Sequence, residues 1–346
     1  MAREEQTNYN SLVAQLRKDG PERAYLLYGE EDYLLNHYLD ELKKLCLKDA
    51  PSEFSYLKLE GSDFTVEEIS DFVSQFPFLS DRTLVEIRGF DNKSLKGDET
   101  DKFAELLSDI PEYATLALIM DSDEKPDMRR KPFTDIKKHG RVINFTTQGE
   151  SSLVDWIKRH FKARKKEISS ANARKLISWS GNQMSVLLPE IEKLSYGVRG
   201  ERIESDDIEL IATKQLSAKT YEICENISAK NFADALAILQ ELVQSRTEPV
   251  IILSSIGTQL KKLYAAAVYL KEKPNKSFII KIAGSQEWLA NKYIKSASGF
   301  SLNTLAESLR LCVETDFMMK SGQGEPVELL YDLIYKIYAE AKSESA

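Results

Sequence analysis

The first 150 residues alternate short apolar runs with amphipathic stretches, and this alternation constrains the fold more than any other feature of the chain. Five runs have the length and side-chain content of buried strands. They cover residues 24–28, 54–59, 82–87, 114–120 and 141–145. Between them, stretches such as 32–47 and 65–76 repeat apolar residues every three or four positions. Strands separated by helices predict a largely parallel sheet with helices covering it.

Helical periodicity takes over after residue 150, and β-branched runs become scarce. Four helices, at 153–166, 170–180, 184–196 and 205–211, predict a small helical domain. From about residue 220 to 341 the pattern predicts a further all-helical domain. We therefore expect three domains: an α/β domain over 1–148, a small helical domain over 149–214, and an all-α domain over 215–346.

Composition and charge exclude several classes of protein. No stretch approaches the roughly 20 apolar residues that a membrane-spanning helix needs, and the first ten residues lack the apolar core of a secretory signal. We therefore expect a cytoplasmic protein with no membrane contact. A formal net charge of −8 argues against a protein that coats DNA by itself. The three cysteines and three histidines are widely separated in the sequence, which predicts buried free thiols and no metal site.

The residues after the first predicted strand do not suit nucleotide chemistry. A phosphate-binding loop needs a glycine-rich turn followed by Lys-Ser or Lys-Thr. Here Gly29 is followed by Glu30, Glu31 and Asp32, and the next lysine is Lys43. Three acids in this place would repel phosphate. The sequence predicts a nucleotide-binding type of fold that binds no ATP and no other cofactor.

Four segments taken in order resemble one family. They are 25–35 (YLLYGEEDYLL), 76–85 (FPFLSDRTLV), 123–131 (DEKPDMRRK) and 181–194, in this order along the chain. They resemble the delta subunits of the bacterial DNA polymerase III clamp loader. The resemblance implies a degenerate AAA+-like (RecA-like) domain, a helical lid domain and an all-helical collar domain.

The same resemblance implies a function without catalysis. A protein of this family is expected to bind and open the sliding clamp during DNA replication, with no catalytic residue of its own. Its partners would be the clamp, the other clamp-loader subunits of a hetero-pentamer, and primer–template DNA held by the assembly. ATP would be supplied and hydrolysed by the partner subunits.

The segment 76–85 contains the apolar residues that the resemblance assigns to clamp contact. Phe78 and Leu79, next to the stiffening Pro77, are expected to project as anchors for a hydrophobic pocket. The alternative is that they cover the end of the preceding helix as part of the core. We expect core packing for Phe76.

Basic and acidic residues later in the α/β domain leave two questions open. Five cations could face DNA in an assembled ring or could form a solvated surface: Arg129, Arg130, Lys131, Lys137 and Lys138. Asp121 follows the fourth predicted strand, where a magnesium-binding acid would lie in an ATPase. Because the lysine of the phosphate loop is absent, we expect Asp121 to cap a helix instead.

Two other functions compete with the clamp-loader assignment. One is an ATP-hydrolysing AAA+ enzyme in which Gly29 opens a divergent phosphate loop and Asp121 holds magnesium. It requires a lysine that the loop lacks. The other is a stand-alone scaffold that binds DNA through its basic stretches, which the acidic net charge opposes.

Overall fold

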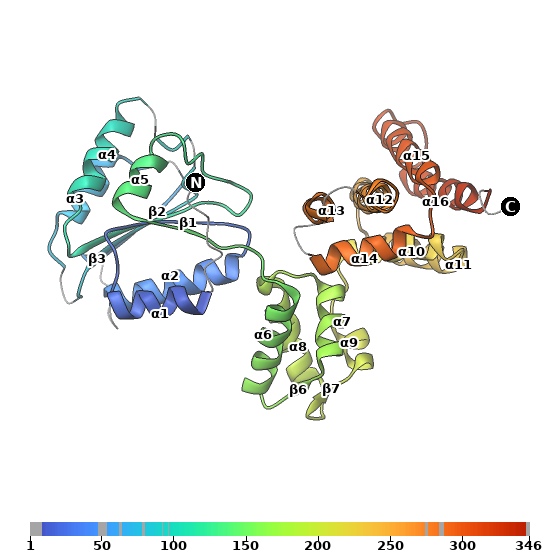
Figure 1. Ribbon diagram of the computed structural model, residues 1–346, viewed down its shortest axis with the longest axis horizontal. Coiled ribbons are helices and arrows are strands. Elements are labelled where there is room, and N and C mark those ends of the chain that lie inside the picture. Colours follow the sequence, from blue (N-terminus) through green and yellow to red (C-terminus); the bar gives the residue numbers. More distant parts are fainter. Residues whose placement is uncertain are drawn as a thin grey trace. The chain divides into compact units, whose positions relative to one another are not determined.

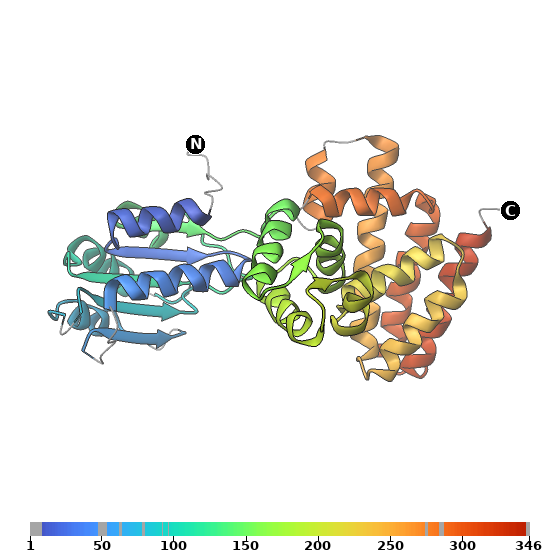
Figure 2. The same cartoon turned by 90° about the horizontal axis from the view of Figure 1, so that it is seen from below.

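The computed structural model of the 346-residue chain forms two compact units (Figures 1 and 2). The structure describes residues 9–47, 54–61, 64–77, 80–91, 93–95, 97–273, 276–283 and 287–343. The first unit comprises Met1–Gln148 together with Gln183–Ser185. The second comprises Gly149–Asn182 and Val186–Ala346.

The first unit is built on a five-stranded parallel sheet. Its strands are β1 (Ala24–Tyr28), β2 (Tyr56–Glu60), β3 (Thr83–Arg88), β4 (Ala114–Ile119) and β5 (Arg141–Asn144). Their order in the sheet is β2-β3-β4-β1-β5, and every neighbouring pair is parallel. The helices are α1 (Tyr9–Asp19), α2 (Asp32–Leu47), α3 (Val66–Val73), α4 (Glu99–Asp109) and α5 (Phe133–His139).

Helices cover both faces of this sheet, and strand alternation explains how. In Figure 1, α1 and α2 lie on one face and α3, α4 and α5 on the other. Within β1, Leu26 and Tyr28 pack with the α3–α5 core, whereas the alternate residues Tyr25 and Leu27 are also fully or nearly fully buried. A strand that is apolar on both faces therefore fits only the centre of a three-layer domain.

A buried carboxylate crosses from the sheet to α2. Glu86 of β3 is fully buried, and its carboxylate bonds Lys43 Nζ at 2.6 Å, Arg88 Nε at 2.6 Å and Tyr56 Oη at 2.7 Å. Burial raises the pKa of Glu86, but these three hydrogen bonds outweigh it, so the pKa lies below its ordinary value. The network fixes α2 on the sheet and occupies Lys43, the first lysine after Gly29.

The second unit is almost wholly helical. Its first part contains α6 (Glu150–Ala163), α7 (Ser170–Ser180), α8 (Met184–Gly197) and α9 (Ser205–Ile211). The two-residue strands β6 (Glu167–Ile168) and β7 (Arg202–Ile203) pair in parallel beside them. The first two residues of α8 belong to the first compact unit.

Seven further helices share one hydrophobic core that includes Leu239, Ile256, Leu305 and Ile334. They are α10 (Leu216–Ser228), α11 (Phe232–Gln244), α12 (Pro249–Glu272), α13 (Lys276–Ala283), α14 (Glu287–Ala297), α15 (Leu302–Lys320) and α16 (Pro326–Ser343). Pro249 occupies the first turn of α12, where its missing N–H leaves no helical hydrogen bond unmade.

The predicted fold class is confirmed: a parallel α/β domain is followed by helical segments. The five strands lie within two residues of their predicted ends, and the three cysteines are buried free thiols as expected. The pairing of β6 with β7 was not predicted, because two-residue strands leave no periodic pattern. The division into three domains at 148 and 214 stays a prediction. Across the described ranges, no helix is both long enough and apolar enough to cross a membrane.

Candidate functional site

The connection from β1 to α2 lies where a nucleotide-binding domain of this type holds phosphate. β1 ends at Tyr28 and α2 begins at Asp32, so only Gly29, Glu30 and Glu31 connect them. Gly29 has φ of +127°, and a Cβ there would lie 2.3 Å from the backbone oxygen of Phe145. The turn therefore requires glycine, but it is too short for the eight-residue loop that wraps a phosphate chain.

Glu31 turns its carboxyl group inward at this turn. The residue is fully buried, and Glu31 Oε2 accepts a hydrogen bond of 3.4 Å from the backbone N–H of Met184, the first residue of α8. Glu31 Oε1 is buried without a partner among the described residues. Burial raises the pKa of Glu31 to about 7, against the smaller opposing effect of backbone N–H groups of Met184 and Tyr33. The carboxyl group thus contacts the N-terminus of α8, but burial outweighs this contact and favours the protonated form.

Other carboxylates gather at the same carboxyl edge of the sheet. Burial and the nearby Asp121 raise the pKa of Asp32. Burial, followed by Asp91, Asp123 and Asp121, raises the pKa of Glu124. These acids follow β1, β3 and β4, whose ends meet at one edge because the strands are parallel. A triphosphate brought to this edge would meet mutual repulsion.

These residues do not fit a nucleotide or its magnesium ion. Lys43 is bonded to Glu86, and the loop offers no cation in place of the missing lysine. Among the residues that the structure describes, no group of three or more His, Cys, Asp or Glu side chains is arranged to hold a metal. The expectation that Asp121 caps a helix is wrong, because the next helix, α5, begins only at Phe133.

The predicted clamp-contact segment lies at the opposite edge of the sheet. It connects the end of α3 at Val73 with the start of β3 at Thr83, on the amino side of the strands. Phe78 and Leu79 themselves lie outside the described residues. The expectation of a buried Phe76 is wrong: its side chain is 79% exposed and stacks on Tyr113, with ring centroids 4.6 Å apart. Because α3 ends three residues earlier, Phe76 has left the apolar face of that helix.

Arg82 fixes the return of this segment to the sheet. Its guanidinium donates to the backbone oxygens of Pro21 and Glu112 and to Thr115 Oγ1. Those acceptors belong to the turns before β1 and β4 and to the start of β4, all at the amino edge. The return of the chain to β3 therefore has a fixed position at this edge.

The five predicted DNA-facing cations fall into two groups. Arg129 and Arg130 pair with Asp127, at 3.0 and 3.4 Å, and Lys131 pairs with Asp101 at 2.8 Å. Lys137 and Lys138 are exposed in the last turn of α5, where cations complement the helix dipole. Their contact with DNA stays a prediction.

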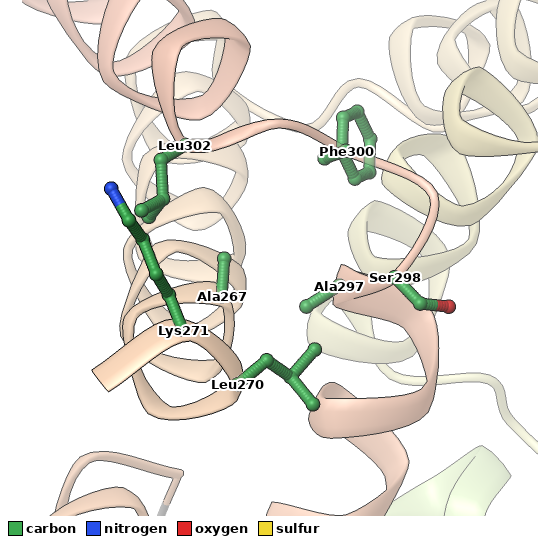
Figure 3. Close-up of a pocket in the computed structure, with 7 residues that line it drawn as sticks. All are labelled: Ala267, Leu270, Lys271, Ala297, Ser298, Phe300 and Leu302. Atoms are coloured by element: carbon green, nitrogen blue, oxygen red, sulfur yellow. The ribbon is translucent and has the colours of Figure 1, made fainter. Parts of the chain in front are cut away.

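An open hollow in the second unit is lined mainly by apolar side chains. Figure 3 shows the residues that line it, from α12, the end of α14 and the following loop. They are Ala267, Leu270, Lys271, Ala297, Ser298, Phe300 and Leu302. The lining contains no acid, histidine or thiol to serve as a general base or nucleophile.

Sequence reasoning missed the burial of Glu31. Three consecutive acids predict a solvated turn, and the signal that one of them is buried lies far away, in the N-terminus of α8 that it contacts. Only the spacing offers a hint: with Gly29 against Phe145 and Asp32 starting α2, the residue between them has little room to turn outward.

Two family models match this chain, one in its N-terminal part and one in its C-terminal part. Residues 25–146 match the family model "DNA polymerase III, delta subunit", and residues 217–337 match "DNA polymerase III delta subunit, C-terminal domain". The DNA polymerase III subunit delta of Bacillus subtilis is 22% identical over 325 residues, covering 91% of this chain and 92% of the relative. A probable DNA polymerase III subunit delta of Aquifex aeolicus is 21% identical over 333 residues, covering 92% and 91%.

A solved structure shows the same fold. The Bacillus subtilis DNA clamp loader delta protein superposes with a TM-score of 0.66 at 19% identity. The match covers 96% of this chain and 100% of that one.

We predict that the purified chain binds no magnesium-ATP. The three-residue connection cannot wrap the phosphates, and the acids around it repel them. Calorimetric titration should give no saturable heat at millimolar ATP, with a subunit that carries a complete phosphate loop as the positive control. Saturable binding in the micromolar range would contradict this account of the site.

We predict that Glu31→Gln stabilises the protein at pH 8 but not at pH 5. The raised pKa means that native-state stability falls as pH rises from about 4.5 to about 7, because the folded protein must give up a proton it holds more tightly than the unfolded chain does. Glutamine has no such cost, so the variant should gain up to about 3 kcal/mol at pH 8 relative to pH 5. Denaturant unfolding followed by circular dichroism at both pH values measures the gain. An equal effect of the substitution at both pH values would show that Glu31 does not titrate in this range.

Proposed function

The chain belongs to the family of delta subunits of the bacterial DNA polymerase III clamp loader, and from this we propose that it binds the sliding clamp and opens it without hydrolysing ATP. The α/β unit would hold the clamp, and the helical unit would hold the partner subunits. Primer–template DNA would be bound by the assembly.

One observation carries this proposal: the connection that would have to bind phosphate is only three residues long and contains a buried carboxyl group of the protein itself. Glu31 occupies the turn after β1 and contacts the N-terminus of α8, and the turn is too short for a phosphate loop. A chain that keeps this fold but has lost its nucleotide groups can act only through binding energy. It can shift the clamp between closed and open states by binding the open state more tightly.

The segment at the amino edge of the sheet supports clamp binding. Phe76 is exposed, and Pro77, Phe78 and Leu79 follow it in the sequence, so the segment 74–82 is rich in large apolar residues. Arg82 anchors one end of the loop to the sheet. Apolar anchors on a fixed base are typical of the few residues that dominate binding energy at an interface.

The position of the segment also suits a subunit that works by binding. Because it lies at the opposite edge from Glu31, clamp contact would not need to compete with the contacts that hold the β1–α2 turn. To move a ring from 1% to 99% open, the preference for the open form must reach about 5.5 kcal/mol. Partner subunits that bind ATP would supply the part of this free energy that the present chain does not.

Helices α10–α16 would join counterparts from the other subunits in a collar, as part of a hetero-pentamer. Val313 and Phe317, four residues apart on α15, are 70% and 63% exposed. Residues at this spacing lie on the same face of a helix. An apolar pair of this size on a solvent face suits a surface that a partner subunit covers.

We predict that Phe78→Ala with Leu79→Ala weakens clamp binding by about 2 kcal/mol or more for each residue, since these side chains would fill a pocket on the partner. Binding to purified clamp is measured by surface plasmon resonance. Phe317→Ala is the matched control, because it removes an exposed phenylalanine from the helical unit. The thermal midpoint of the double variant should stay within about 2 °C of that of the parent protein. A midpoint lowered by many degrees, with clamp affinity per folded molecule unchanged, would instead place both side chains in the core.

We predict that Val313→Ser with Phe317→Ser weakens assembly with the other loader subunits by at least about tenfold while leaving clamp binding unchanged, because it removes apolar contact area at the centre of the proposed collar surface. Gel filtration of the mixed subunits measures assembly. Phe76→Ser is the control, since Phe76 is as exposed but belongs to the α/β unit. Normal assembly of the α15 variant would exclude this face of the helix from the collar.

A further inference from the structure

The sheet of the first unit ends in a strand that has a neighbour on one side only. β2 pairs with β3, and no other strand of the described residues lies beside it. Gly61, directly after β2, donates its backbone N–H to β3. Because the backbone groups of successive residues in a strand point to alternate sides, Leu57 and Leu59 also bond β3. The N–H and C=O groups of Lys58 and Glu60 therefore point to the outer edge.

Apolar side chains beside this edge are only half-buried. Leu57 and Leu59 of β2 pack against the core under α3–α5, and so does Phe72 of α3, but all three are partly exposed. The alternate residue Tyr56 lies on the other face of the strand, where its hydroxyl bonds Glu86. A chain laid along the outer edge of β2 would cover the apolar surface that remains open on the α3 face.

A hollow lies on this face, between β2 and α3. Its lining includes the apolar side chains of Leu57 and Phe72 and three exposed carboxylates, those of Glu67, Glu68 and Asp71. Glu67 and Asp71 are four residues apart on α3 and therefore share one side of the helix. The hollow thus combines an apolar surface with a concentration of negative charge, next to backbone groups that a further strand could bond.

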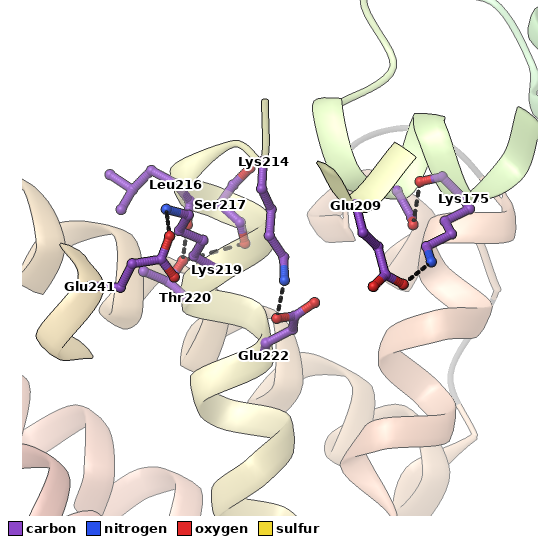
Figure 4. Close-up of polar contacts among 10 residues, drawn as sticks. Lys175, Glu209, Lys214, Leu216, Ser217, Lys219, Thr220, Glu222 and Glu241 are labelled. Atoms are coloured by element: carbon purple, nitrogen blue, oxygen red, sulfur yellow. Dashed lines mark hydrogen bonds and ion pairs between the residues drawn. The ribbon is translucent and has the colours of Figure 1, made fainter. Parts of the chain in front are cut away.

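Cations do not neutralise these three carboxylates within the described part of the chain. Acids elsewhere do form ion pairs, and Figure 4 shows three such pairs in the second unit: Lys175 with Glu209, Lys214 with Glu222, and Lys219 with Glu241. By contrast, no described cation lies within ion-pair distance of Glu67, Glu68 or Asp71. The sequence explains this, because residues 59–81 contain no lysine, arginine or histidine. The hollow therefore keeps its negative charge.

The combination of edge, apolar surface and charge selects the kind of chain that fits. An acidic helix face by itself is a solvated surface. Beside an open sheet edge it suits a basic strand, because a lysine or arginine of that strand can lay its aliphatic stem over Leu57 and Phe72 and bring its charge to the carboxylates. A second copy of this chain fits less well, since antiparallel pairing of two β2 strands about Lys58 would place like charges opposite each other.

We propose that the outer edge of β2 and the acidic hollow bind an extended segment of another protein, one that has lysine or arginine at every second position. The segment adds a sixth strand to the sheet, in which backbone hydrogen bonds to Lys58 and Glu60 supply affinity and alternate side chains supply specificity. Its basic side chains face α3. The residues between them face Tyr56 and Lys58, where uncharged β-branched side chains fit best.

Binding of the full-length protein to two fluorescent peptides of one composition tests this proposal. One peptide alternates, Lys-Thr-Lys-Val-Lys-Thr-Lys, and the other carries the same residues in blocks, Lys-Lys-Lys-Lys-Thr-Val-Thr. Both have the same charge, but only the first places all its lysines on one face of a strand. Fluorescence anisotropy should show the alternating peptide binding at least about fivefold more tightly. Equal affinities would overturn the proposal, since charge alone would then account for binding.

Substitutions in the hollow locate the peptide. Glu67→Gln with Asp71→Asn should weaken binding of the alternating peptide at least about fivefold, because it removes two of the three carboxylates. The matched control, Glu105→Gln with Asp109→Asn, removes the same charge at the same spacing from exposed positions of α4 and should stay within about twofold. Circular dichroism shows whether each variant is folded. Equal losses in the two pairs, or no loss in the first, would overturn the assignment to this hollow.

Amide hydrogen exchange of the unaltered protein, followed by NMR, tests the added strand directly and needs no variant. The amides of Lys58 and Glu60 should exchange fast in the free protein and at least about tenfold more slowly with saturating alternating peptide, whereas those of Leu57 and Leu59 are already protected by β3. Unchanged exchange at Lys58 and Glu60 with bound peptide would overturn strand addition. Protection of these two amides in the free protein at high concentration would assign the edge to a second copy of the chain instead.

Discussion

The structure depends on a carboxyl group buried in the connection between β1 and α2, the connection that binds phosphate in nucleotide-binding domains of this type. Glu31 sits in a three-residue turn, under the N-terminus of α8, with its pKa raised to about 7 by burial. The carboxyl group accepts a hydrogen bond from one backbone N–H at the N-terminus of α8 without any ligand. It also removes the site from nucleotide chemistry, since the turn has neither the length nor the cation to bind one. The connection between β1 and α2 is therefore ordered without a bound nucleotide.

The parallel sheet places the β1–α2 connection and the proposed clamp-contact segment at opposite edges. All five strands end at the edge that contains Glu31 and the surrounding acids, and the segment 74–82 joins the sheet at the opposite edge. The Glu86 network locks α2 on one face of the sheet, so the two edges are connected by a rigid layer. A subunit that acts by binding, as proposed here, would need a stiff body behind its contact surface, and this sheet suits that role.

Most of the fold could be predicted from the sequence, because the spacing of apolar residues shows which positions of a helix or strand are buried. The strands stand out as short apolar runs and α2 as a helical repeat, so their ends are predicted within two residues. Phe76 was misplaced because the apolar pattern of α3 continues past Val73, where the helix stops. The burial of Glu31 could not be predicted, since it depends on a contact with Met184, a residue distant in the sequence. Charged residues give no periodic signal of burial, and only the tertiary structure shows which of them are buried.

The central claim is that this chain opens the clamp through binding energy alone, and one measurement tests it most directly. Its affinity is compared for an intact clamp ring and for a clamp subunit whose ring interface has been disrupted, each with and without magnesium-ATP. The account predicts binding to the disrupted subunit that is tighter by about tenfold or more, roughly 1.4 kcal/mol, and unaffected by ATP. Equal affinity for both forms, or an affinity that requires ATP, would contradict it.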